Sequence, residues 1–140
     1  MLFRSDIFMG GNVRGGGGRG AGALRGVRVR GLHFPISTHI HWNGHTAVKY
    51  QRPGMRRPLV RFPPEVIEFK AHVRPTNSRH EIYQAWKQIE SSLPANFDRS
   101  AWRWHHHWRV GEMQLVPEPF HTKVGHVGRA LTWPPEIPVR

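Results

Sequence analysis

The stretch "SAWRWHHHWRVGEMQLVPEPFHTKVGH", residues 100–126, decides the fold class that the sequence predicts. Its first part, "WRWHHH", is rich in aromatic residues and predicts a strand, and "EMQLVP" predicts a second short strand. Gly111 lies between them and makes a tight reversal easy. Pro117 and Pro119 then suit the first turn of a helix and not its interior. The predicted local order is therefore strand, turn, strand, helix.

The same stretch concentrates the histidines of the chain. Five of the 11 histidines lie in it: His105, His106, His107, His121 and His126. Imidazoles from a strand end and a facing helix can hold one divalent metal and leave positions open for water and substrate. Adjacent strand residues point in opposite directions, so one histidine can bind the ion while the next acts as general base on a water. The two later histidines converge only if the helix is distorted or ends near Gly125.

An amphipathic helix is predicted just before this stretch. Ser78 and Glu81 have the spacing of a capping box, which satisfies two amide donors at a helix start. Apolar residues then recur at helical spacing, at Ile82, Ala85, Trp86, Ile89 and Leu93. Pro94 ends the helix, which we interpret as scaffold.

The N-terminal part divides into two segments of different composition. Residues 10–31 are about half glycine with several arginines, which predicts a flexible linker or a Gly-Arg tail that binds nucleic acid. Asn43-Gly44 then lies between alternating residues and predicts a β-hairpin. Three histidines, His39, His41 and His45, surround that turn. They are either a metal site or, as we favour, polar residues on the wet face of an edge hairpin.

Charge and composition restrict the classes of function. The chain has 21 Lys and Arg against 9 Asp and Glu, a formal charge of +12, which predicts a polyanionic partner such as nucleic acid. It has no cysteine, which excludes disulfides, thiolate zinc sites and a cysteine nucleophile. It shows neither an apolar run of membrane-spanning length nor a signal peptide, so another element would have to carry it out of a cell. A cationic membrane-active protein is disfavoured because the one good helix has no cationic bias.

One ordered set of residues resembles a known family. The run Trp104-His105-His106-His107, followed by "MQLVP" over residues 113–117, then His121 and His126, resembles the WHH nucleases. These are toxin nucleases of the HNH/endonuclease VII superfamily, found at the C-termini of bacterial polymorphic toxins. The resemblance covers about residues 78–130. The chain departs from the family pattern after His126, where it reads Val127-Gly128-Arg129 and lacks a second glycine.

The resemblance implies an α+β fold with a ββα-metal (HNH-like) finger, which follows the amphipathic helix and the N-terminal hairpin. The chain would then consist of a linker or tail over 1–31, a β-rich part over 32–77 and the nuclease core over 78–140. Roles follow by position: His105, His121 and His126 bind one divalent metal (Mg²⁺, Mn²⁺ or Zn²⁺), His106 is the general base, and Gln114 orients the base. His107 has no assigned role, although a register shift of one residue would make it the base.

The function implied is a metal-dependent endonuclease that hydrolyses DNA or RNA, with DNA preferred, after secretion or delivery into a target cell. Arg109, Lys123 and Arg129 would hold flanking phosphates, or are ordinary solvated surface residues. A cell that makes such a toxin would need a neutralising immunity protein, expected to be acidic. The alternative is a non-catalytic nucleic-acid-binding module in which the histidines form a structural metal site.

Overall fold

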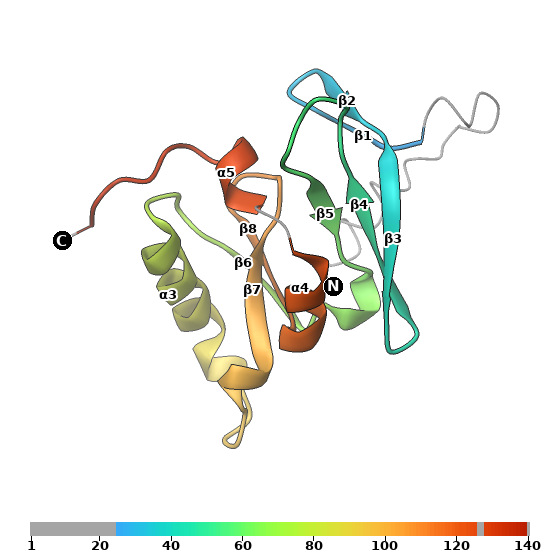
Figure 1. Ribbon diagram of the computed structural model, residues 1–140. Helices are drawn as coiled ribbons and strands as arrows, with labels where there is room; N and C mark the ends of the chain where they lie inside the picture. The colour runs from blue at the N-terminus through green and yellow to red at the C-terminus, as the bar shows by residue number, and fades with distance from the viewer. Residues whose placement is uncertain (1–24, 126–127, 140) are drawn as a thin grey trace.

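A computed structural model describes residues 25–125 and 128–139 of the chain. These residues form a mixed α+β architecture with three small antiparallel sheets and three α-helices (Figure 1). Most of the predicted N-terminal linker or tail, and His126, lie outside the described residues. In the described part, no helix has the length and apolar character needed to cross a membrane.

The N-terminal part forms two of the sheets. Its strands are β1 (Val27–Val29), β2 (Leu32–Phe34), β3 (Ile36–Trp42), β4 (His45–Tyr50) and β5 (Leu59–Arg61). β1 pairs with β2, and β3-β4-β5 form a three-stranded sheet. Asn43 and Gly44 connect β3 to β4 with positive φ angles of 51° and 81°, which a two-residue hairpin turn requires. The predicted hairpin is therefore confirmed, and β1 lies within the segment predicted as linker or tail.

The third sheet contains the histidine stretch. Its strands are β6 (Phe69–His72), β7 (Trp102–His106) and β8 (Glu112–Pro117), in the order β6-β8-β7. Helix α4 (Glu118–Val124) follows β8 directly, and α5 (Gly128–Thr132) comes next. The predicted order of strand, turn, strand and helix is confirmed. β6 belongs to the predicted β-rich part, residues 32–77, but it pairs with β8 of the predicted nuclease core, residues 78–140. The two predicted parts therefore share this sheet.

Helix α3 (Ser78–Ile89) begins with a different cap from the one predicted. Asn77 is the N-cap, and its Oδ1 accepts a hydrogen bond from the His80 backbone N–H at 3.0 Å. Glu81 is fully buried and does not close a box with Ser78. The sequence prediction was wrong on this cap because Asn77 is an equally good cap residue, one position earlier. The helix passes into a 3₁₀ turn, Glu90–Ser92, before Pro94.

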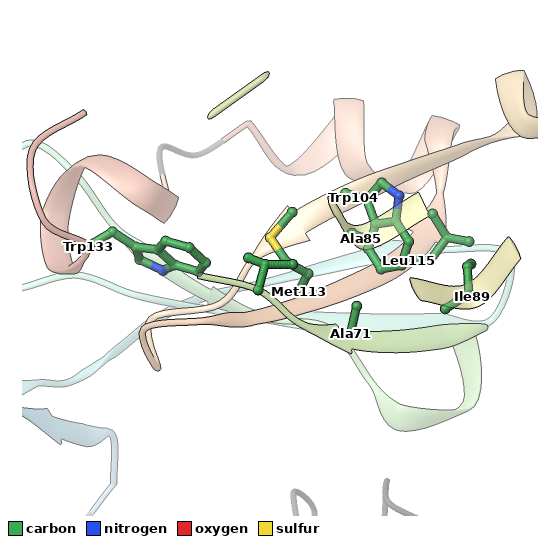
Figure 2. Packing of buried hydrophobic residues seen from close by; sticks show 8 residues of the cluster. Ala71, Ala85, Ile89, Trp104, Met113, Leu115 and Trp133 are labelled. Atoms are coloured by element: carbon green, nitrogen blue, oxygen red, sulfur yellow. The ribbon is translucent and has the colours of Figure 1, made fainter. Parts of the chain in front are cut away.

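The β6-β8-β7 sheet is the middle layer of the molecule. On one side it packs against α3 through a cluster that Figure 2 shows, made of Ala71, Val73, Ala85, Ile89, Trp104, Met113, Leu115 and Trp133. On the other side, β8 and α4 pack against the β3-β4-β5 sheet through Ala47, Val60, Phe62, Val66, Val116, Phe120 and Val124. Each β7 side chain therefore enters one of two different environments, according to the face on which it lies.

Candidate active site

The alternation of strand β7 divides the adjacent histidines between the two faces of the sheet. Trp104 packs in the cluster on the α3 side. His105 lies on the α4 side, where its ring centroid is 5.0 Å from Phe62 and 6.1 Å from His107. His106 lies on the α3 side, 3.0 Å from Glu81. The structure thus brings His105 and His107 together and places His106 across the strand.

His105 and His121 form the pair best suited to hold a metal. Their ring centroids are 6.2 Å apart, and His105 is 1% exposed. Two imidazoles on one ion at Zn–N distances of about 2.0–2.1 Å place their ring centres roughly 5–6 Å apart, which is close to the observed separation. Burial, and then the charge of Arg103, lowers the pKa of His121, which keeps it in the neutral form that binds metals.

The third predicted ligand, His126, lies outside the described residues. Helix α4 ends at Val124, and Gly125 has a positive φ of 56°, so the helix ends near Gly125, which is one of the two conditions stated above for convergence of the later histidines. Within residues 25–125 and 128–139, no group of three or more His, Asp or Glu is arranged to hold an ion. The described residues therefore supply two imidazoles of the predicted set.

Strand β8 adds a buried polar row on the same face. Gln114 is the Cα partner of His105, and its Nε2 donates to Glu112 Oε2 at 2.8 Å. The other oxygen of Glu112, Oε1, accepts from Arg109 Nη1 at 2.8 Å, and Lys70 Nζ lies 3.3 Å from Oε2. Burial alone raises the pKa of Glu112, but its polar and charged neighbours outweigh it, and the carboxyl group stays ionised.

Gln114 also presents an acceptor to this face. Its Oε1 is buried and has no hydrogen-bond partner in the described part of the chain. A buried amide oxygen in that position is suited to accept from a polar group that enters the site. Sequence reasoning missed Glu112, although it lies two residues before Gln114 on a predicted strand and therefore shares its face.

His107 is fixed in one tautomer. Its Nδ1 accepts a hydrogen bond from the Arg109 backbone N–H at 3.0 Å, so the ring proton is on Nε2. Burial lowers the pKa of His107 to about 3. Action of His107 as a base at Nδ1 would first require release of the Arg109 N–H, which argues against the register shift considered above.

His106 is the same tautomer, but it is held through its other ring nitrogen. A carboxylate only accepts, so the 3.0 Å contact with Glu81 Oε1 places the proton of His106 on Nε2 and leaves the Nδ1 lone pair as the acceptor. Burial lowers the pKa of His106 and outweighs the opposing effect of Glu81, so the ring is neutral at neutral pH. This tautomer is the one that a general base held by a carboxylate requires. The sequence predicted His106 but gave no sign of Glu81 as its partner.

A comparison with protein families bears on this arrangement. Residues 70–128 match the family described as the DNase/tRNase domain of colicin-like bacteriocin. The match covers less than half of the chain, but it includes nearly all of the β6-β8-β7 sheet, together with α3 and α4. It supports a bacteriocin nuclease toxin domain in this segment. No curated protein and no solved structure matches the chain.

The three residues predicted to bind phosphate all have partners within the protein. They are Arg109, Lys123 and Arg129. Arg129 donates from Nε and Nη2 to the two oxygens of Glu81, both at 2.7 Å. Lys123 Nζ donates to the His41 carbonyl at 2.7 Å and is exposed, and Arg109 binds Glu112. Lys123 is the most accessible of the three, whereas Arg129 is engaged beneath the surface. Their binding to phosphate stays a prediction.

Proposed function

We propose that this chain is a metal-dependent endonuclease of the HNH/endonuclease VII type that hydrolyses phosphodiester bonds of DNA, with RNA as the second candidate substrate. One observation carries the proposal. His105 from a strand and His121 from the following helix lie next to each other on a buried face, inside the segment that matches the colicin-type nuclease family.

The metal would be held by His105 and His121, with His126 as the predicted third ligand. A divalent ion supplies an acidified water and neutralises the charge that develops on the phosphate. Gln114 and Glu112 border the His105 side, and the amide oxygen of Gln114 would orient a polar group in the site.

His106 would act as the general base and accept the proton of the attacking water at Nδ1. Glu81, which holds the Nε2–H, would keep the ring in this tautomer and stabilise the imidazolium that forms. β7 is an edge strand of its sheet, so His105 and His106 occupy the two faces of the same edge. His106 would lower the pKa of His121 whenever its own ring is protonated, which indicates that the two rings are within electrostatic range of each other.

The biological role that we propose is that of a delivered toxin of the polymorphic, bacteriocin-like kind. A producing cell would then need an acidic immunity protein that covers the site. Expression of the chain alone should stop growth of a host cell, and harmless expression without any partner would count against this role.

The decisive experiment is cleavage of plasmid DNA and of RNA by the purified chain with Mg²⁺, Mn²⁺, Zn²⁺ or a chelator. His106→Ala should abolish cleavage, and His72→Ala, at an exposed position of β6, is the matched control. Both variants should melt as cooperatively as the wild type. Chelator-insensitive cleavage by His106→Ala would overturn the proposal. Binding without cleavage under every metal, with loss of the fold on chelation, would instead establish a structural metal site.

A further inference from the structure

The positive charge of the chain is concentrated in the N-terminal sheets. Residues 25–64 contain no Asp or Glu and eight Lys or Arg, whereas residues 65–139 contain eight acidic and nine basic residues. The segment that matches the nuclease family, residues 70–128, holds eight basic and five acidic residues, so about two thirds of the excess charge of the described residues lies outside it. The charge therefore needs an explanation other than the catalytic site.

Folding gathers several of these arginines at one end of the molecule. The β1–β2 hairpin packs on the β4–β5 connection, since Val27, Val29 and Met55 contact the same apolar cluster. Figure 1 shows the β1–β2 turn and the β4–β5 connection at the same end of the sheets. The basic end, as we name it, consists of Arg28 in the hairpin and Arg52, Arg56 and Arg57 in the connection.

The arginines of the basic end keep their charge available. Arg28, Arg56 and Arg57 are exposed, and Arg52 is half-buried. Among the described residues, the one ion pair that involves residues 25–64 joins His45 to Glu65. Within residues 25–125 and 128–139, no carboxylate therefore competes with an external anion for these guanidinium groups.

The basic end also adjoins the candidate active site. Trp108, from the turn between β7 and β8, packs edge-on against Tyr50 with ring centroids 5.8 Å apart. Arg61 of β5 binds the Tyr50 hydroxyl at 2.6 Å, and its charge contributes to lowering the pKa of His107. An extended ligand bound at the basic end would therefore continue toward the histidine face.

We propose that the basic end is a docking surface for the sugar-phosphate backbone of nucleic acid, separate from the catalytic residues. The inference rests on the proposed function in so far as that function makes nucleic acid the substrate. Guanidinium groups match phosphate in a bidentate manner, and such contacts position a nucleic acid without reading its sequence. The docking surface holds the duplex while the histidine face acts on it.

The test is binding of a fluorescent 30-base-pair duplex by the full chain in excess chelator, across a salt series. The docking variant combines Arg28→Gln, Arg56→Gln and Arg57→Gln. The matched control combines Arg74→Gln, Arg79→Gln and Lys87→Gln, which removes the same charge from exposed positions in and just before α3. Because each phosphate contact contributes about 0.9 to the slope of log K against log salt, the docking variant should lose about 2–3 units of slope and at least about tenfold in affinity.

The control variant should bind within about threefold of the wild type. Equal losses in both variants would show that net charge alone matters, and would overturn the inference. Wild-type affinity of the docking variant would also overturn it, and would assign the basic end to another acidic macromolecule, such as a neutralising protein. Binding is measured without cleavage, so a chain that binds through the basic end but never cuts refutes the nuclease proposal alone.

Discussion

Replacement of Glu81 by Gln should be among the most damaging single changes in the chain. Glu81 is 0% exposed. It accepts from Arg129 Nε and Nη2 and from the Thr76 N–H, each at 2.7 Å, and from His106 Nε2 at 3.0 Å. Gln keeps the volume but removes the charge and turns one acceptor oxygen into a donor that faces other donors.

The expected loss is about 3 kcal/mol of unfolding free energy, the lower end of the range of about 3–5 for a broken buried ion pair. The lower end applies because the Arg129 side chain keeps 11% exposure and a bond to the Pro134 carbonyl. Urea unfolding in chelator at pH 7.5, followed by tryptophan fluorescence, measures the change as a shift of the midpoint. Glu90→Gln, at an exposed ion pair just after the same helix, is the control and should leave the midpoint near wild type.

A double-mutant cycle separates the ion pair from general disruption. Arg129→Met alone leaves a buried carboxylate without its main partner and should cost a similar amount. If the two groups stabilise one another, the double variant loses less than the sum of the two single losses by roughly 1–3 kcal/mol. Additive losses, or a loss below about 1 kcal/mol for Glu81→Gln, would refute the reasoning.

Three further predictions follow from the same structure. Burial would raise the pKa of Glu81, but Arg129, the Thr76 N–H and His106 hold it below its ordinary value. The stabilisation by Glu81 is therefore present above the unfolded pKa of about 4.3 and is lost as the pH falls through the lower folded pKa. The melting temperatures of wild type and Glu81→Gln should converge as the pH falls below the unfolded value, and a constant difference between them would contradict this. Phe120→Ala should cost about 3–5 kcal/mol in urea unfolding, because its buried ring packs on Phe62 and Trp42 between the layers, whereas the exposed Pro119→Ala should cost much less. Gly111→Ala should cost about 1–2 kcal/mol of unfolding free energy and so lower the melting temperature, because φ is +95° and an added Cβ would lie 3.3 Å from the Val73 carbonyl oxygen. An unchanged melting temperature would refute the tight turn.

The sequence alone determined those features whose signals are local. The Asn43-Gly44 turn predicted its hairpin because both positions need positive φ, which few other residue pairs tolerate. Pro117 at the end of β8, Pro119 in the first turn of α4 and the apolar spacing in α3 likewise predicted helices at the places where they occur. The histidine stretch was predicted as strand, turn, strand and helix for the same reason, since each element depends on residues within a few positions.

Only the tertiary structure decided which groups meet. Glu81 is 25 residues from His106 in the sequence. Its place in the first turn of a helix predicted a capping role, whereas packing of the helix against β7 buries Glu81 beside the His106 ring. The separation of His105 from His106 follows from strand alternation, but their partners depend on which layers cover the two faces of the sheet. The basic end is likewise assembled from a hairpin and a distant connection. Such contacts follow from the burial of apolar surface between layers, which a local pattern of residues does not specify.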